Sequence, residues 1–238
     1  MIARAAWFIV LGAVAVITAG LQFDRQSRYA PHLASSVPSP FRAFAQPHIV
    51  ADAMNSGDNE RALSEARKLV AIRPMPAEHL RLLSFAEFRN GEIEEGSYSI
   101  QLAARRGWRD LSAQIAMLEL ARAAGDQPET ARRFAALFLH PGQDTDALSQ
   151  IAGNVFAEGS GETRAVFADI LAGSERWNSA FMRNGAGVIP PAAFVDITRL
   201  ASKAGARFTC REIDLAKRRL SRIAPEMSED FTSIIEYC

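Results

Sequence analysis

The hydrophobic pattern begins with an uninterrupted apolar run. Residues 5–23 contain no charged side chain. As a helix, these 19 residues span about 28 Å, close to the ~30 Å hydrocarbon core of a bilayer. The run therefore predicts a transmembrane signal-anchor that follows a short tail, residues 1–4.

Charged residues flank this run on both sides, so they discriminate poorly between the two membrane orientations. Arg4 precedes the run, and Asp24, Arg25 and Arg28 follow it. A short tail that carries Arg4 favours a cytoplasmic N-terminus. We therefore expect a single-pass protein of the inner (cell) membrane with a periplasmic soluble domain. Two alternatives are a cleaved signal peptide, for which residues 17–19 are a poor cleavage site, and an apolar helix of a soluble core.

The next part of the chain, residues 24–43, lacks apolar periodicity. Prolines and serines recur in it, and both favour loops over helices. The sequence therefore predicts a flexible linker between the membrane segment and the folded domain. The residues concerned are Pro31, Ser35, Ser36, Pro38, Ser39 and Pro40.

Four glycines then recur at one constant interval, at Gly57, Gly91, Gly125 and Gly159. An acidic residue directly follows the first three. The same interval aligns apolar residues 8 positions before each glycine and 9, 12 and 13 positions after it. Steps of three and four are typical of one helix face. Since glycine adopts the left-handed conformation past a helix end without cost, the pattern predicts four helical hairpins that turn at these glycines.

One hairpin cannot bury its apolar face alone, whereas stacked hairpins form a continuous core. Alanine, the strongest helix former, is abundant, and strand-type runs are almost absent beyond position 25. We therefore predict an all-α fold. An α-solenoid of about four hairpins covers residues 44–176, follows the transmembrane helix and linker, and precedes a C-terminal helical cap over residues 177–238.

The pattern resembles the tetratricopeptide repeat, whose period of about 34 residues equals the interval between these glycines. The resemblance covers about residues 43–176 and is closest in the first unit. There, Gly57, Ala62 and Pro74 match the family's turn glycine, its small residue in the second helix and its terminating proline. The later units lack the family's first-helix aromatics and shift or replace its small residue and proline. The residues at or near those positions are Gly96, Trp108, Ala131, Pro141 and Ala165.

In this family, the first helices of the hairpins line a concave groove. The resemblance implies a partner-binding groove in which arginines beside phenylalanines suit an extended peptide with acidic and apolar groups. The alternative is that the phenylalanines are core residues and the arginines are solvated. The positions carried over are Arg81, Phe85, Phe88, Arg89, Ile115, Glu119, Arg122 and Phe156.

Turn and cap signals decide the prediction for the C-terminal third. Residues 174–190 contain Asn-Gly and further glycine and are predicted as a loop. Proline suits the first helical position and predicts a helix over residues 191–203. Capping-box spacing predicts a second helix over residues 210–223, and a serine cap predicts a last one over residues 228–237.

Two cysteines, Cys210 and Cys238, occur in this third. In an exported domain they could form a disulfide that fastens the tail. The alternative is two unpaired thiols.

Charge and motifs give no indication of catalysis. Lys+Arg and Asp+Glu number 27 each. The chain therefore has no surplus of positive charge of the kind that binding to nucleic acid requires. None of the four histidines lies three or four residues from another, and no C-x-x-C, H-E-x-x-H or G-x-S-x-G motif occurs. We therefore expect no catalytic residue, no metal and no cofactor.

Two functions follow as expectations. The first is a non-catalytic, membrane-anchored scaffold that binds a protein or peptide partner in an envelope, secretion or polysaccharide assembly. The second is an accessory subunit or enzyme of envelope processing whose site the C-terminal helices complete. A pocket where acidic side chains converge would favour the second, and a broad groove would favour the first.

Overall fold

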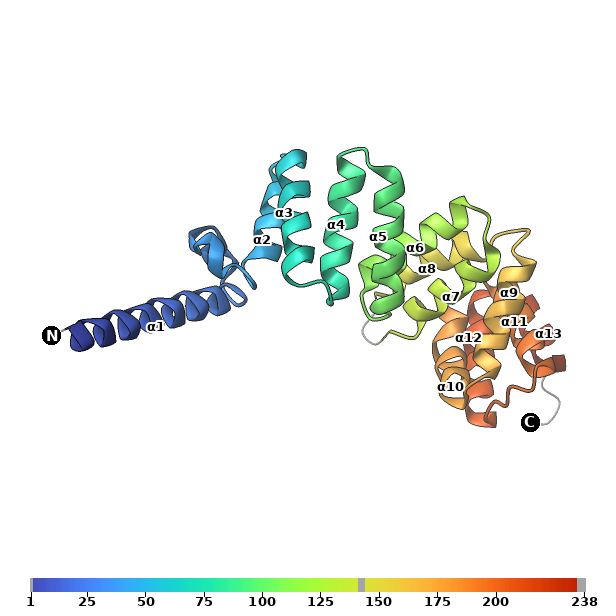
Figure 1. Cartoon of the computed structure of the whole chain (residues 1–238). Coiled ribbons are helices and arrows are strands. Elements are labelled where there is room, and N and C mark those ends of the chain that lie inside the picture. Colours follow the sequence, from blue (N-terminus) through green and yellow to red (C-terminus); the bar gives the residue numbers. More distant parts are fainter. Residues whose placement is uncertain (1, 141–143, 235–238) are drawn as a thin grey trace. The chain divides into compact units, whose positions relative to one another are not determined.

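The computed structural model describes residues 2–140 and 144–234, which form helices and no strands (Figure 1). Two compact units divide the chain, at residues 1–113 and 114–238. The first unit contains α1 (Ile2–Ser27), η1 (Pro31–Ser36), η2 (Ser39–Phe41), α2 (Gln46–Asn55), α3 (Asn59–Ile72), α4 (Ala77–Arg89) and α5 (Ile93–Arg106). The boundary falls within α6 (Leu111–Ala123). The second unit continues with α7 (Gln127–Phe138), α8 (Thr145–Val155), α9 (Gly161–Ala172), α10 (Glu175–Asn184), η3 (Gly185–Gly187), α11 (Pro191–Lys203), α12 (Cys210–Ile223) and α13 (Pro225–Ile234).

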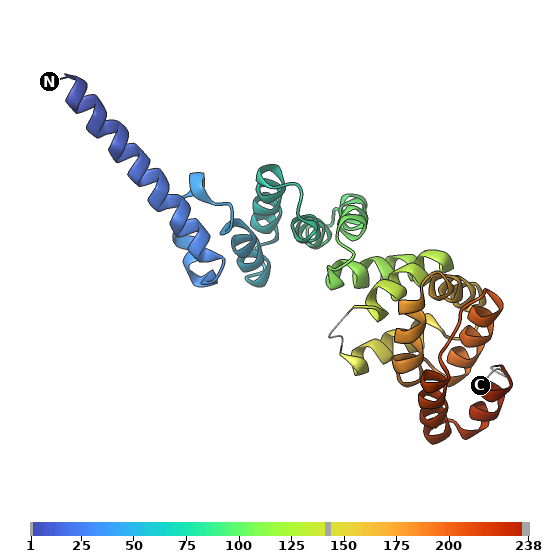
Figure 2. The same ribbon diagram turned by 90° about the horizontal axis from the view of Figure 1, so that it is seen from below.

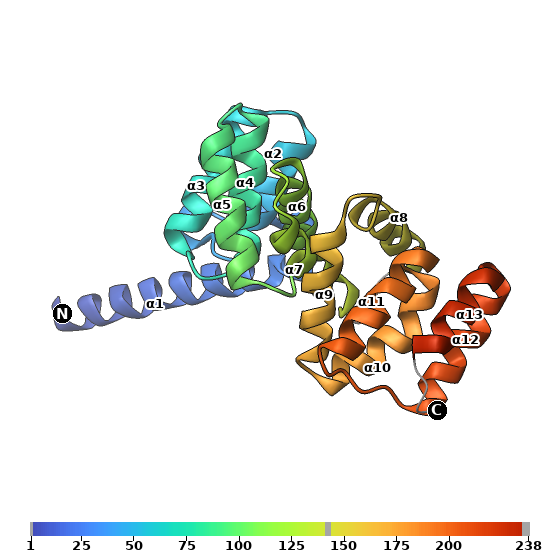
Figure 3. The same ribbon diagram turned by 90° about the vertical axis from the view of Figure 1, so that its right-hand side faces the viewer.

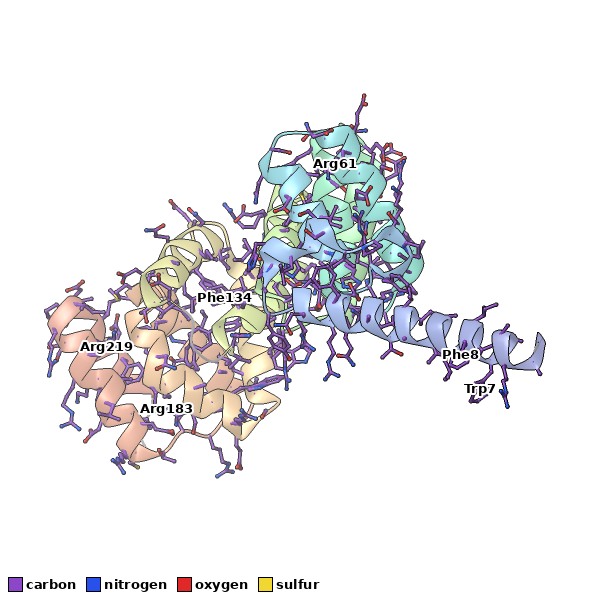
Figure 4. All side chains as sticks on the ribbon, turned by 90° about the vertical axis from the view of Figure 1, so that its left-hand side faces the viewer. Trp7, Phe8, Arg61, Phe134, Arg183 and Arg219 are labelled. Carbon is purple, nitrogen blue, oxygen red and sulfur yellow. The ribbon has the colours of Figure 1, made fainter. Side chains whose placement is uncertain are left out.

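Helix α1 is long and apolar enough to cross a membrane, with a mean hydropathy of 2.0 in a window that is not buried. Figure 2 shows it as one straight helix that ends at the N-terminus. Trp7 and Phe8 project from it away from the rest of the unit (Figure 4) and are 62% and 71% exposed. Exposure of such side chains to water is unfavourable, so this helix has the properties of a membrane segment.

The predicted turns at the four glycines are confirmed. Gly57, Gly91, Gly125 and Gly159 have φ angles of 77°, 82°, 70° and 84°, and each lies between two successive helices. At the first turn, the amide of Asp58 donates to the carbonyl of Ala53 at 3.1 Å, which is the six-to-one bond of a Schellman motif.

The acid after the glycine begins the next helix. The Asp58 carboxylate accepts from the amide of Arg61 at 3.1 Å, and the Asp126 carboxylate accepts from the amide of Glu129 at 3.0 Å. These are N-caps, which satisfy amides that have no partner within the helix. Glu92 occupies the equivalent position without a side-chain cap. The Gly-Asp pair therefore ends one helix and starts the next.

In the first unit, small residues let neighbouring helices approach closely. Helix α3 packs against α2 and α4, and α4 packs against α5. Alanines contribute much of this contact, and at Gly96 an added Cβ would lie 2.7 Å from the Phe88 ring. The core of α2, α3 and α4 consists of Val50, Ala53, Met54, Ala62, Leu63, Ala66, Leu69 and Ala86.

The second unit is filled by phenylalanine rings. Phe134 on α7 and Phe167 on α9 are fully buried, with ring centroids 5.4 Å apart. The Phe194 ring lies next to two further rings. Its centroid is 4.8 Å from that of Phe181 and 5.6 Å from that of Phe231. Helix α9 packs against α7, α10 and α11, and Figure 3 shows α11 beside α9.

The predicted flexible linker over residues 24–43 is wrong. Helix α1 continues through Ser27, and the residues that follow form η1 and η2. Ala34 and Val37 from this segment are buried with Ala45 and Ile49. Its prolines and serines predicted a loop, but contacts with distant residues keep the segment ordered.

The predicted loop over residues 174–190 is also wrong, because residues 175–184 form α10 and residues 185–187 form η3. Buried Phe181 and Met182 anchor this helix in the aromatic core. The glycines follow the helix and do not disrupt it.

The helices predicted over residues 191–203 and 210–223 are confirmed with the same bounds. The last helix starts at Pro225 and not at Ser228. Its predicted end at Tyr237 lies outside the described residues, as does Cys238 of the predicted disulfide. Cys210 is not a free thiol.

Candidate interaction surface

Helix α4 carries four of the predicted groove residues. It starts after Pro76, whose backbone is extended, and it ends at Arg89, with Asn90 as the C-cap before the left-handed Gly91. Arg81, Phe85 and Arg89 are spaced by four residues and therefore share one face, whereas Phe88 lies to one side of it.

Arg81 is fixed by a carboxylate and an aromatic ring. Its Nε donates to Oδ2 of Asp110 at 2.9 Å, and its guanidinium carbon lies 5.7 Å from the centroid of the Phe85 ring. The other oxygen of Asp110, Oδ1, accepts a hydrogen bond from the amide of Ala113 at 3.1 Å. Ala113 lies in the first turn of α6, so this bond caps the helix. The side chains of Arg81 and Asp110 are 22% and 14% exposed, so the guanidinium is oriented but still reachable.

Trp108 and Arg109 extend this surface. Trp108 is 53% exposed, and the guanidinium carbon of Arg109 lies 5.0 Å from its ring centroid. A Cβ at Gly107 would lie 2.4 Å from the Cβ of Ala77, so the turn that carries both residues packs onto the start of α4. We name Arg81, Phe85, Trp108, Arg109 and Asp110 the Arg81–Trp108 surface. Sequence reasoning missed Trp108 as a surface residue, although an exposed tryptophan next to arginine is a usual interface signal.

Phe88 and Arg89 contact the neighbouring helices α5 and α2. The Phe88 ring packs on the backbone of Gly96 in α5. Nη1 of Arg89 donates to the carbonyl of Met54 at 2.6 Å, in the last turn of α2, where orphan carbonyls need donors. Phe85 is partly buried and packs against the core of α2, α3 and α4. Of the α4 residues, Arg81 offers the most specific chemistry to a partner.

The remaining predicted groove residues lie in α6 and at the end of α8. Ile115 is 39% exposed. Glu119 and Arg122 form an exposed ion pair of 2.7 Å. Phe156 is only 2% exposed, and its ring centroid lies 4.9 Å from that of Phe134. The groove position predicted for Phe156 therefore does not fit its place in the aromatic core.

Glu87 is a buried acid on the opposite side of α4 from the predicted groove. It is 6% exposed, and within the described part of the chain its Oε2 atom has no hydrogen-bond partner. Burial raises the pKa of Glu87, and the nearby charges of Glu92 and Glu95 raise it further. A hydrogen bond from Ser99 and the charge of Arg67 act in the opposite direction. This carboxyl lies between α4 and Ser99 of α5, and it does not line the hollow formed by Arg67, Lys68, Asn90 and Glu92.

Open hollows lie on both units. One of about 360 Å³ lies between α3 and the Gly91 turn and is lined by Arg67, Lys68, Asn90 and Glu92 among others. Another of about 190 Å³ lies between the Gly125 and Gly159 turns. Among residues 2–140 and 144–234, no group of three or more His, Cys, Asp or Glu side chains is placed to hold a metal ion.

Comparison with known proteins adds no relative to this picture. No protein-family model and no curated protein sequence matches the chain.

Proposed function

We propose that this protein is a non-catalytic, membrane-anchored scaffold whose hairpins form a tetratricopeptide-like solenoid that binds a protein or peptide partner. The observation that carries the proposal is the recurrence of helix, left-handed glycine and helix at one constant interval from Gly57 to Gly159. Repeats of this kind present a long surface built from equivalent helices, which suits binding to extended partners.

The Arg81–Trp108 surface supports a partner with acidic and apolar groups. Arginine and tryptophan are the side chains most often found as interface anchors. Arg81 is held in place by Asp110 and Phe85, so little side-chain entropy is lost when it binds. A partner carboxylate can accept from the guanidinium donors that Asp110 leaves free, while its apolar side chains cover Phe85 and Trp108.

Helix α1 supports the membrane part of the proposal. We place the N-terminus in the cytoplasm and the folded units in the periplasm, at a bacterial-type inner membrane, in an envelope, secretion or polysaccharide assembly. Reporter fusions before residue 5 and after residue 28 test this orientation. Activity of a periplasmic reporter at the first site, or its absence at the second, would reject it. If the expressed protein lacks residues 1–23, the apolar segment is a cleaved signal peptide and not an anchor.

Photo-crosslinking tests the binding surface. A photoreactive amino acid at position 108 of the full chain is expected to capture one partner, and the same group at Tyr98, exposed on α5, is the matched control. Arg81→Glu should reduce capture from position 108 at least about tenfold, because it replaces an attractive charge with a repulsive one. Arg105→Glu, an exposed change on α5, should leave capture unchanged. The proposed surface is rejected if positions 98 and 108 capture the partner equally. It is also rejected if position 108 captures as much in Arg81→Glu as in the unaltered chain.

A further inference from the structure

The end of α1 is joined to the folded part of the first unit by a buried carboxylate. Asp24 is 2% exposed, and its oxygens accept hydrogen bonds from three successive amides, those of Ala43, Phe44 and Ala45, at 3.1, 3.0 and 2.9 Å. Successive amides that converge on one anion form a nest, and bonds to a charged acceptor are stronger than neutral ones. This joint therefore links the last turns of α1 to the start of α2.

Apolar contacts surround the same joint. A Cβ at Gly20 would lie 2.6 Å from the Phe41 ring, so η2 packs directly on α1. Phe23 and Phe41 both pack against the small cluster of Ala34, Val37, Ala45 and Ile49. The segment after the apolar helix thus has a fixed position relative to that helix.

The geometry of α1 places this joint at the level of lipid headgroups. The apolar run ends at Phe23 and α1 ends at Ser27, about 6 Å further along the axis. The headgroup layer on each side of a bilayer is also about 5–7 Å thick. Tyr29, which is 74% exposed, follows at once and is a residue type enriched at membrane interfaces.

Unneutralised arginines gather at this level. Residues 25–51 contain Arg25, Arg28 and Arg42 and no aspartate or glutamate, and Arg73 from the end of α3 reaches the same place. The guanidinium carbon of Arg28 lies 5.8 Å from the ring centroid of Tyr29 and 5.9 Å from the ring centroid of Phe44. The guanidinium carbon of Arg73 lies 4.8 Å from the same Phe44 centroid. Within the described ranges, no ion pair joins Arg25, Arg28 or Arg73 to a carboxylate.

We propose that Arg28 and Arg73, on either side of the Phe44 contact, form a binding site for the phosphate of an anionic phospholipid at the membrane surface. The inference rests on the proposed membrane anchor. Guanidinium groups donate in pairs to phosphate oxygens, and those of Arg28 and Arg73 lie 5.9 and 4.8 Å from the centroid of the same Phe44 ring. An anionic bilayer is the occupant that the site favours, because α1 brings these arginines to a headgroup layer whenever it is inserted. The lipid contact and the Asp24 joint together hold the first unit in one orientation against the membrane.

Mixed nanodiscs test the site with the full chain. The protein is reconstituted in phosphatidylcholine and phosphatidylglycerol at a two-to-one molar ratio, and the lipids that stay bound after release are counted by native mass spectrometry. Phosphatidylglycerol should be retained in preference to phosphatidylcholine. Each arginine changed to glutamine should reduce that preference about fivefold, since one such charge contributes about 1 kcal/mol. The variants are Arg28→Gln, Arg73→Gln and the double change.

The matched control is Arg61→Gln with Arg105→Gln, two exposed arginines of the same unit that lie on α3 and α5. It should keep the full preference. An unaltered chain without preference, or a control that loses as much as Arg28→Gln with Arg73→Gln, would overturn the proposal. Hydrogen exchange of residues 25–45 should also slow in the mixed discs. If inorganic phosphate slows it equally in pure phosphatidylcholine discs, the site binds small anions and not lipid, which also overturns the proposal.

Flotation with liposomes separates this inference from the anchor on which it rests. If the chain does not float, the proposed membrane anchor fails. If it floats but shows no preference for phosphatidylglycerol, the anchor stands and the headgroup site fails. Asp24→Ala should leave flotation intact while the amides of residues 43–45 exchange faster. Unchanged exchange at those amides would show that the joint does not depend on Asp24.

Discussion

In the first unit, helices meet through alanine and glycine, whereas in the second they meet through phenylalanine rings. Ala62, Ala66 and Gly96 let α3 and α5 lie close to their neighbours. Between α7 and α9, the rings of Phe134 and Phe167 fill the space instead, with centroids 5.4 Å apart. The same glycine turn serves both arrangements, with φ angles between 70° and 84° at the four positions.

The constant interval between the glycines therefore specifies the turn and not the packing between helices. A left-handed residue is required at one backbone position, and only glycine meets that requirement without cost. The space between helices can be filled by small residues at short distance or by large ones at longer distance, provided the volume is conserved. Four predictions test this comparison.

The largest effect is expected in the aromatic core. Phe167→Ala removes a fully buried ring that contacts four other rings. It should lower the free energy of unfolding of the second unit by about 3–5 kcal/mol. Urea denaturation of the full chain in detergent, followed by hydrogen exchange resolved by peptide, measures it. Equal loss of protection in α2 and α3 would contradict the division into two packing types.

Gly96→Ala tests the close packing of the first unit. The new Cβ would lie 2.7 Å from the Phe88 ring, so α4 and α5 must separate. We expect a loss of about 1–3 kcal/mol. Gly153→Ala is the matched control, because that glycine is also helical and has no atom within 4 Å of an added Cβ. The control should gain about 0.5–1 kcal/mol from helix propensity. Thermal denaturation of both variants should therefore shift in opposite directions.

Alanine at the turn glycines tests what the two units share. Gly91→Ala and Gly125→Ala meet no steric contact but must adopt a positive φ, so each should lose about 1–2 kcal/mol. The two losses should agree within about 0.5 kcal/mol even though the cores differ. A much larger loss in one unit, measured by urea denaturation, would show that packing also determines the turn.

The smallest effect concerns the buried acid of the first unit. The folded-state pKa of Glu87 is raised above the usual 4.5 by burial. The folded state therefore favours the protonated carboxyl. The resulting contribution to the free energy of unfolding is fully present below pH 4.5 and is lost as the pH rises through the folded-state pKa. Glu87→Gln should remove this dependence and stabilise the unit by about 1 kcal/mol at neutral pH. Glu94→Gln, an exposed change on α5, is the control and should show no such gain.

The candidate site was less accessible to sequence reasoning than the fold. Register along α4 singled out Arg81, Phe85, Phe88 and Arg89 alike. It could not show that Phe88 and Arg89 connect α4 to Gly96 and Met54. It placed Phe156 on a surface although neighbouring rings bury it. The role of each side chain depends on what the next helix brings near it, and that information is not local.

The elements that could be predicted from the sequence are those with local causes. The apolar run of α1, the left-handed glycines, and the capped helices 191–203 and 210–223 all follow from a few neighbouring residues. Tertiary structure alone decided the ordering of residues 24–43, where Asp24 reaches the distant amides of residues 43–45, and the helix over residues 175–184, which is anchored by distant rings. Local backbone preferences act within one turn, whereas burial and long-range hydrogen bonds can only act once the chain has brought separate segments together.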